Sequence, residues 1–244
     1  MDRFEMDRFS MTPQSAFATT TVATAERMTA FLRKVYGWMC AGLAITAATA
    51  LAVTSSPGLQ AAILGNRPVF FGLIIAELVM VFVLAARVTR LKPATAAGLF
   101  LVYSVLNGAT LSVIFLTYSG ASIATTFVVT AGMFGALALF GSTTKRSLAG
   151  IGQFVFMGLI GLMLAMVVGF FWHSDALQFV ISVVGVLVFT GLTAWDAQRL
   201  KQMAAVLPEG SVGSYAVVGA LSLYLDFINL FLFLLRFLGG GRRD

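Results

Sequence analysis

The sequence predicts an all-α fold, a polytopic membrane bundle of about seven transmembrane helices. Hydrophobic residues make up 59% of the 244 residues and charged residues 11%, whereas about a quarter of the residues in soluble domains are charged. The mean hydropathy is +0.94. Apolar runs near the length of about 20 residues that crosses a bilayer are expected over residues 35–53, 69–86, 94–118, 123–140, 154–172, 177–198 and 216–238.

Turn residues separate these runs, as at Ser56-Pro57-Gly58 and Pro208-Glu209-Gly210. We expect a mobile polar tail over residues 1–30, a single membrane domain over 31–238 and a short C-terminal tail over 239–244. The N-terminal tail lacks the apolar core of a signal peptide. The first span is therefore expected to act as an uncleaved insertion signal.

The net charge of +6 lies at the ends of the apolar runs, which indicates membrane topology and no nucleic-acid partner. Basic residues gather before the first run and after the second, fourth and sixth, so the positive-inside rule predicts a cytoplasmic N-terminus. Seven crossings would place Arg236, Arg242 and Arg243 outside, which the rule disfavours. A last segment that re-enters the membrane and returns is the alternative.

Signals of enzymatic chemistry are weak. The chain has one cysteine, Cys40, and one histidine, His173, so it has neither an intrachain disulfide nor a histidine cluster for zinc. No phosphate loop or nucleophile elbow is present. We expect no enzymatic activity and no cofactor. An intramembrane aspartyl protease is an alternative, although Asp226 lacks the glycine-rich surroundings typical of such enzymes.

Two aspartates in the last two runs, Asp196 and Asp226, are the main candidate functional residues. A charged side chain at mid-bilayer costs about 2.5–3.5 kcal/mol on insertion scales, so such residues usually mark a pathway. Ser222, Asp226 and Asn229 share one helical face, which makes Ser222 and Asn229 candidate polar support. Asp196 could pair with Arg199, three residues further on.

The predicted depths of the two aspartates match, since both lie about 10 Å from the cytoplasmic ends of their helices. They could therefore face each other. Two like charges about 4 Å apart repel by about 4 kcal/mol at an effective dielectric near 20, so the pair is expected to share one proton. Such a pair is a pH-sensitive latch between two helices. When deprotonated, Asp196 and Asp226 would suit Ca²⁺, which binds carboxylate oxygens.

Glu77 lies in the second apolar run, and we interpret it as a second acidic site on the same ion path. Structural hydrogen bonding is the alternative interpretation of Glu77. Arg87 and Arg90 lie about three turns further toward the cytoplasmic end. A polar stripe on the third run is more often explained by packing than by a pore lining; it comprises Tyr103, Asn107 and Thr110.

Two segments resemble the Bax inhibitor family of membrane proteins. They are GALSLYLDFINLFLFLLRFL, residues 219–238, and TAWDAQRLK, residues 193–201. The resemblance extends over about residues 31–238. It implies a bundle of seven helices with the last helix at the centre.

The same resemblance implies a pH-dependent Ca²⁺ leak controlled by two aspartates, which match Asp196 and Asp226. Glu77 matches an acidic residue on the family's ion path. The family's arginine lock matches Arg87 or Arg90, at a different spacing.

We therefore expect a pH-sensitive, calcium-permeable leak channel that is gated by a proton-sharing aspartate pair. The alternative is a non-transporting membrane regulator of a membrane-bound protease or stress response, with the N-terminal tail as its handle. The expected partners are the lipid bilayer, Ca²⁺, protons and a second membrane protein. The expected location is a bacterial inner membrane.

Overall fold

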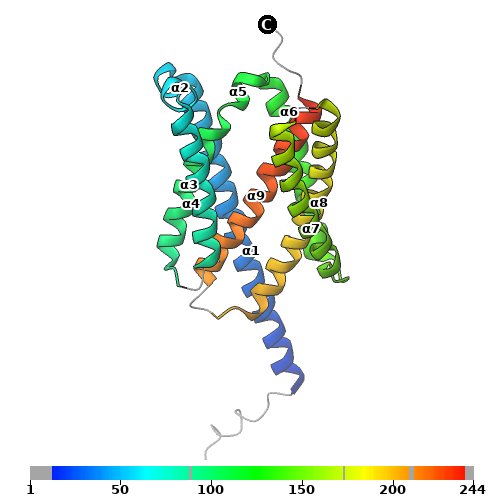
Figure 1. The fold of residues 1–244 in the computed structure, drawn as a ribbon. Helices are drawn as coiled ribbons and strands as arrows, with labels where there is room; N and C mark the ends of the chain where they lie inside the picture. Colours follow the sequence, from blue (N-terminus) through cyan, green and yellow to red (C-terminus); the bar gives the residue numbers. More distant parts are fainter. Residues whose placement is uncertain (1–12, 88–89, 173, 209–211, 240–244) are drawn as a thin grey trace, which may run out of the picture.

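The computed structural model describes the chain except residues 1–12, 88–89, 173, 209–211 and 240–244, and the side chains of residues 13–24. The described residues form helices and no strand (Figure 1). The helices are α1 (Pro13–Ser55), α2 (Pro57–Ile63), α3 (Arg67–Ala86), α4 (Pro93–Leu111), α5 (Ile114–Thr117), α6 (Gly120–Thr143), α7 (Ala149–Phe171), α8 (Asp175–Val206) and α9 (Val212–Leu238).

Seven of these helical segments are long and apolar enough to cross a membrane, which confirms the predicted fold class. The short helix α2 was not predicted, and the predicted third run, residues 94–118, is divided into α4 and the short helix α5. Both short helices lie at the end of the bundle opposite the start of α1 (Figure 1). Helix α9 traverses the bundle once and ends at that same opposite end. The alternative in which the last segment re-enters and returns is therefore wrong.

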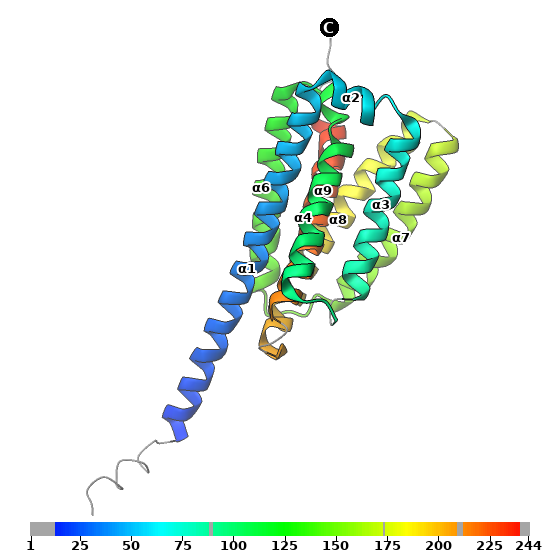
Figure 2. The same cartoon turned by 90° about the vertical axis from the view of Figure 1, so that its left-hand side faces the viewer.

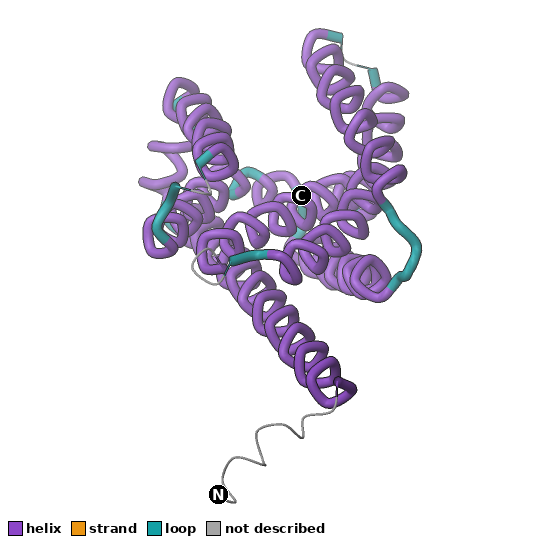
Figure 3. The backbone as a smooth tube through the Cα atoms, turned by 90° about the horizontal axis from the view of Figure 1, so that it is seen from below, coloured by secondary structure: helices purple, strands orange, loops and turns teal. Residues whose placement is uncertain are grey.

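Several helices extend beyond the apolar runs that predicted them. Helix α1 begins at Pro13, inside the predicted polar tail, and projects from the rest of the bundle (Figures 2 and 3). Residues 13–30 are therefore helical, while residues 1–12 of the predicted tail lie outside the described part of the chain. Helix α8 continues to Val206, past the end of its run at residue 198. Apolarity marks only the part of a helix that lies in the bilayer, whereas alanine and other good helix formers continue it beyond.

Helix starts follow local sequence signals. The side chains of Ser56, Asn66, Ser119 and Ser174 each accept a hydrogen bond from the backbone N–H three residues on, at the starts of α2, α3, α6 and α8. These are N-cap bonds. Proline occupies the first turn of α2, α3 and α4, where its missing N–H has no helical partner to lose.

Helix α9 is the central helix, as predicted. It packs against α1, α3, α4, α6 and α8, and 67% of its most apolar window is buried, against 50% or less in every other span. Glycines permit close approaches beside it: a Cβ at Gly219 would lie 2.5 Å from Leu200 Cδ2 on α8, and one at Gly141 on α6 would collide with the carbonyl of Ala194 on α8. These contacts hold α8 close to α9 and α6 on either side of Asp196.

Candidate functional site

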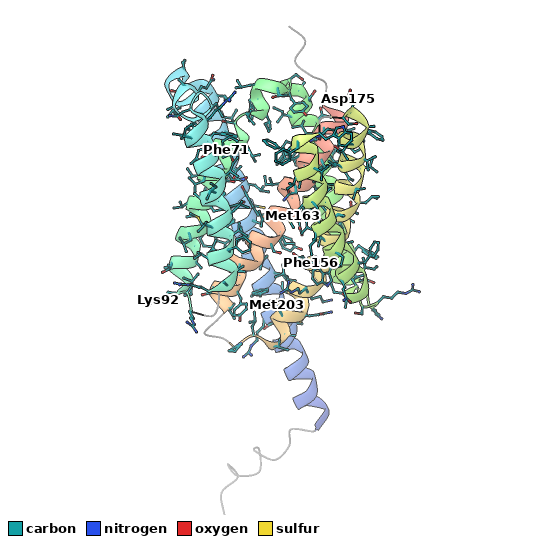
Figure 4. The ribbon with its side chains drawn as sticks, in the orientation of Figure 1. Phe71, Lys92, Phe156, Met163, Asp175 and Met203 are labelled. Atoms are coloured by element: carbon teal, nitrogen blue, oxygen red, sulfur yellow. The ribbon has the colours of Figure 1, made fainter. Side chains whose placement is uncertain are left out.

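Asp196 on α8 lines a cavity of about 340 Å³ between α3, α8 and α9, which we call the Asp196 cavity. Met203, another residue of its wall, lies at the end of the bundle where α1 enters, as does Lys92, whereas Asp175 lies at the opposite end (Figure 4). The cavity is therefore in the half of the bundle nearer the start of α1. Val81 and Ala85 form its α3 wall.

Asp196 is 7% exposed, and its carboxyl has two polar neighbours. The hydroxyl of Ser222 on α9 donates a hydrogen bond to its Oδ2, and Arg199, one turn further along α8, interacts with it electrostatically. The Arg199 guanidinium also lies over the Trp195 ring, 5.6 Å from its centroid. Asp196 thus makes a polar link from α8 to α9 inside a cavity that also contains a positive charge.

Asp226 is 5% exposed, and its buried Oδ2 has no hydrogen-bond partner in the part of the chain that the structure describes. The two aspartates interact electrostatically, but no hydrogen bond joins them. Asp196 bonds instead to Ser222, which lies four residues, about 6 Å along the helix axis, from Asp226. The structure therefore brings the predicted pair together on crossing helices with an offset of about one turn, and it places Ser222 at the crossing.

Three residues that were predicted to support or lock the aspartate pair do not bond to it. Asn229 donates from Nδ2 to the Leu225 carbonyl oxygen at 2.8 Å, so its amide bonds to its own helix. Arg87 and Arg90 are exposed beyond the end of α3, and neither forms an ion pair with Asp196, Asp226 or Glu77. Arg199 is the basic residue in the Asp196 cavity.

Glu77, half-buried on α3, is held by two side chains of α4. Asn107 donates from Nδ2 to its Oε2 at 3.0 Å, and Thr110 donates from Oγ1 to its Oε1 at 2.9 Å. The sequence favoured packing hydrogen bonds for this polar stripe, and two of its three members form hydrogen bonds with the Glu77 carboxyl. Tyr103, the third member, packs edge-to-face on Tyr224 at a centroid distance of 5.8 Å.

Glu77 lines a second cavity, of about 530 Å³, between α3, α4, α5 and α9, which we call the Glu77 cavity. Phe70 and Ile74 of α3 form one wall, and Arg236 near the end of α9 forms part of another. Since α3 starts and α9 ends at the end of the bundle that holds α2 and α5, this cavity lies in the half opposite the Asp196 cavity (Figure 1).

Sequence reasoning missed two residues that bear on Glu77. Tyr224 on α9 donates from its hydroxyl to Asn107 Oδ1 at 2.8 Å, and Thr46 Oγ1 on α1 lies 2.6 Å from the same hydroxyl. A buried tyrosine hydroxyl requires a partner, which was the available signal for Tyr224. No periodicity in the first span distinguishes Thr46.

No group of three or more His, Cys, Asp or Glu side chains that could hold a metal occurs in the described ranges. The candidate site therefore comprises separate carboxyls: Asp196 in one cavity, Glu77 in the other, and Asp226 buried near the crossing of α8 and α9.

A bundle with seven helices that can cross a membrane and three acidic side chains between them defines a multi-pass membrane protein. The chain matches the family described as "Inhibitor of apoptosis-promoting Bax1" over residues 28–243. It therefore belongs to the Bax inhibitor family.

Three bacterial relatives cover most of the chain. The inner membrane protein YbhL of Escherichia coli K12 is 45% identical over 245 residues, with 99% of this chain and 100% of YbhL aligned. An uncharacterized protein of Borreliella burgdorferi is 43% identical, with 88% and 93% aligned. One of Deinococcus radiodurans is 40% identical, with 93% and 96% aligned.

Proposed function

We propose that this protein is a pH-sensitive, Ca²⁺-permeable leak channel of a bacterial inner membrane. Its relationship to a protein named as an inner membrane protein supports the location. The observation that carries the proposal is the arrangement of two cavities in opposite halves of one bundle, each with an acidic side chain and both walled by α3 and α9.

Asp226 lies on α9 between the stretches that line the two cavities. On α9, the Asp196 cavity extends to Leu225 and the Glu77 cavity begins at Leu232, so Asp226 lies in the intervening stretch. On α3, Glu77 and Val81, one turn apart, belong to different cavities. A cation that crossed the bundle along this line would pass from one carboxyl to the next.

Protonation supplies the proposed gate. When both Asp196 and Asp226 are ionised, two buried like charges repel across the α8–α9 crossing, whereas a proton on either one removes that repulsion. Ser222 and Arg199 are the polar and charged groups that face Asp196 from α9 and α8. A change of proton occupancy thus changes the force between α8, which lines the Asp196 cavity, and α9, which lines both cavities.

The test is Ca²⁺ flux into liposomes that contain the purified protein, measured across a pH series. Wild-type protein should conduct with pH-dependent flux, and both Asp196→Asn and Asp226→Asn should flatten that dependence. Asp175→Asn makes the same change on α8 at the opposite end of the bundle from Met203, and it should conduct as wild type does.

Two outcomes contradict the channel. One is wild-type flux no greater than that of empty liposomes, which would favour a non-transporting regulator of a membrane-bound protease or stress response. The other is unaltered pH dependence in both asparagine variants. Cleavage of a membrane substrate that both variants abolish would instead indicate an aspartyl protease.

A further inference from the structure

A chain of hydrogen bonds connects the central helix to Glu77. The Tyr224 hydroxyl on α9 donates to Asn107 Oδ1 on α4 at 2.8 Å, and Asn107 Nδ2 donates to Glu77 Oε2 on α3 at 3.0 Å. Thr46 Oγ1 on α1 lies 2.6 Å from the tyrosine hydroxyl. Four helices therefore meet in one polar chain that ends at the carboxyl in the Glu77 cavity.

The donors and acceptors give this chain a direction. An asparagine side chain has an oxygen that only accepts and a nitrogen that only donates. Because Tyr224 directs its single proton to the oxygen of Asn107, the nitrogen faces Glu77. Thr46 is left to donate to Tyr224 or to the Ser104 carbonyl oxygen, which lies 3.0 Å away.

The tyrosine itself is fixed in place. Its side chain is 0% exposed, and its ring packs edge-to-face against Phe100 and Tyr103 at centroid distances of 5.7 and 5.8 Å. Asn107, by contrast, could exchange its oxygen and nitrogen by a half-turn of its terminal amide with little change in shape. Two contacts distinguish the two orientations: the Glu77 carboxylate, which only accepts, and the Tyr224 hydroxyl, which donates to the amide oxygen.

We propose that Tyr224 is a positioning residue that holds the Asn107 amide with its nitrogen toward Glu77. The reversed amide would present its oxygen to the carboxylate, and two acceptors would then oppose each other at the half-buried Glu77. The effect of Tyr224 on ion passage rests on the proposed function. Its effect on the orientation of Asn107 does not.

Tyr224→Phe removes the hydroxyl and keeps the ring. In the flux assay we expect the KM for Ca²⁺ to rise roughly tenfold while the maximal rate is largely kept. The reason is that an Asn107 amide without a fixed orientation no longer holds the Glu77 carboxylate in one position, so the carboxylate binds Ca²⁺ more weakly. Tyr103→Phe is the matched control, since its ring contacts Tyr224 while its hydroxyl makes no hydrogen bond among the described residues. That variant should keep the wild-type KM.

Nuclear magnetic resonance gives a readout that is independent of transport. The chain contains three asparagines, Asn66, Asn107 and Asn229, so protein labelled with ¹⁵N-asparagine gives three side-chain amide groups. Asn107→Leu assigns the signal of interest. Tyr224→Phe should shift the Asn107 amide signal and leave those of Asn66 and Asn229 in place, which also shows that the variant is folded.

Thr46→Val provides a second variant, because it removes the other hydroxyl beside Tyr224 and should shift the Asn107 signal by a smaller amount. An Asn107 signal that does not move in Tyr224→Phe, or that moves equally in Tyr103→Phe, overturns the positioning role. If the signal shifts as expected and wild-type protein conducts nothing, the positioning role stands and the channel proposal alone fails.

Discussion

The hydroxyl of Ser222 donates a hydrogen bond to Oδ2 of Asp196 and so links α9 to α8 one helical turn before Asp226. Asp196 therefore bonds to Ser222, a neighbour of Asp226 on α9, and not to Asp226 itself. Ser222 donates to the carboxyl of Asp196, whereas Oδ2 of Asp226 has no hydrogen-bond partner among the described residues. This asymmetry predicts different consequences for changes at the three positions.

Ser222→Ala should destabilise the protein. It leaves an oxygen of buried Asp196 without its donor, a loss that costs about 1–3 kcal/mol of unfolding free energy. Unfolding in mixed micelles by a denaturing detergent measures the difference. Ser182→Ala is the control, because the buried Ser182 hydroxyl donates only to the Gln178 carbonyl oxygen of its own helix, at 2.8 Å. Equal losses in both variants would contradict the interhelical link.

Asp226→Asn should stabilise the protein. The change removes a desolvated carboxyl of which one oxygen is unpaired, and it keeps the shape of the side chain. The gain should be larger at alkaline than at acidic pH, since only the ionised carboxylate carries the full cost of burial. Thermal unfolding across a pH series measures it. Asp196→Asn retains an acceptor for Ser222, so a gain as large as that of Asp226→Asn would refute the asymmetry.

Much of the fold could be predicted because each crossing helix is specified within its own segment. Apolarity and length define all seven spans, and the cost of an intramembrane charge singled out Glu77, Asp196 and Asp226. The short helix α2 escaped prediction, since it lacks the length that marks a span. Residues 114–117 were predicted as part of the third run, and the break that makes them a separate helix, α5, has no signal in apolarity.

The contacts between helices could not be predicted in the same way. Asp196 bonds to Ser222 rather than facing Asp226 because the crossing of α8 and α9 sets the register, and that crossing depends on close contacts such as Gly219 against Leu200. Tyr224 reaches Asn107 from a position 117 residues away in the sequence. Such pairings depend on tertiary packing and leave no local pattern.

Gly141→Ala should disturb the region of Asp196. A Cβ at Gly141 on α6 would collide with the Ala194 carbonyl on α8, two residues before Asp196, so the two helices must separate. Overpacking of this kind costs about 1–3 kcal/mol. Gly135→Ala on the same helix is the control, because its Cβ would meet nothing within 4 Å. Denaturation of both variants measures the difference, and equal stability would show that α6 and α8 are not in close contact at this point.

Two substitutions of Glu77 distinguish its role in stability from its role in ion transport. Glu77→Gln keeps a carbonyl oxygen that can accept from Asn107 or Thr110, so it should fold nearly as well as wild type but conduct less Ca²⁺. Glu77→Leu leaves both buried donors without this acceptor and should lose about 1–3 kcal/mol of stability. Denaturation and flux are measured on the same preparations. Wild-type flux in Glu77→Gln would remove Glu77 from the ion path.

The basic residues predict the side of the membrane that each cavity faces. Because they gather at the end of the bundle where α1 enters, the positive-inside rule predicts that this end is cytoplasmic. Single cysteines in a Cys40→Ala background test the prediction, because Cys40 is the only natural cysteine. Leu59→Cys lies on α2 at one end, and Lys92→Cys lies at the other.

A membrane-impermeant maleimide should label Leu59→Cys in intact spheroplasts and Lys92→Cys only after lysis. That pattern would place the Asp196 cavity on the cytoplasmic side, so that the proposed gate would sense cytoplasmic pH and Ca²⁺ from outside would meet Glu77 first. The opposite labelling would reverse both statements. It would also show that the basic residues do not set the orientation of this chain, because the same charges would then lie outside.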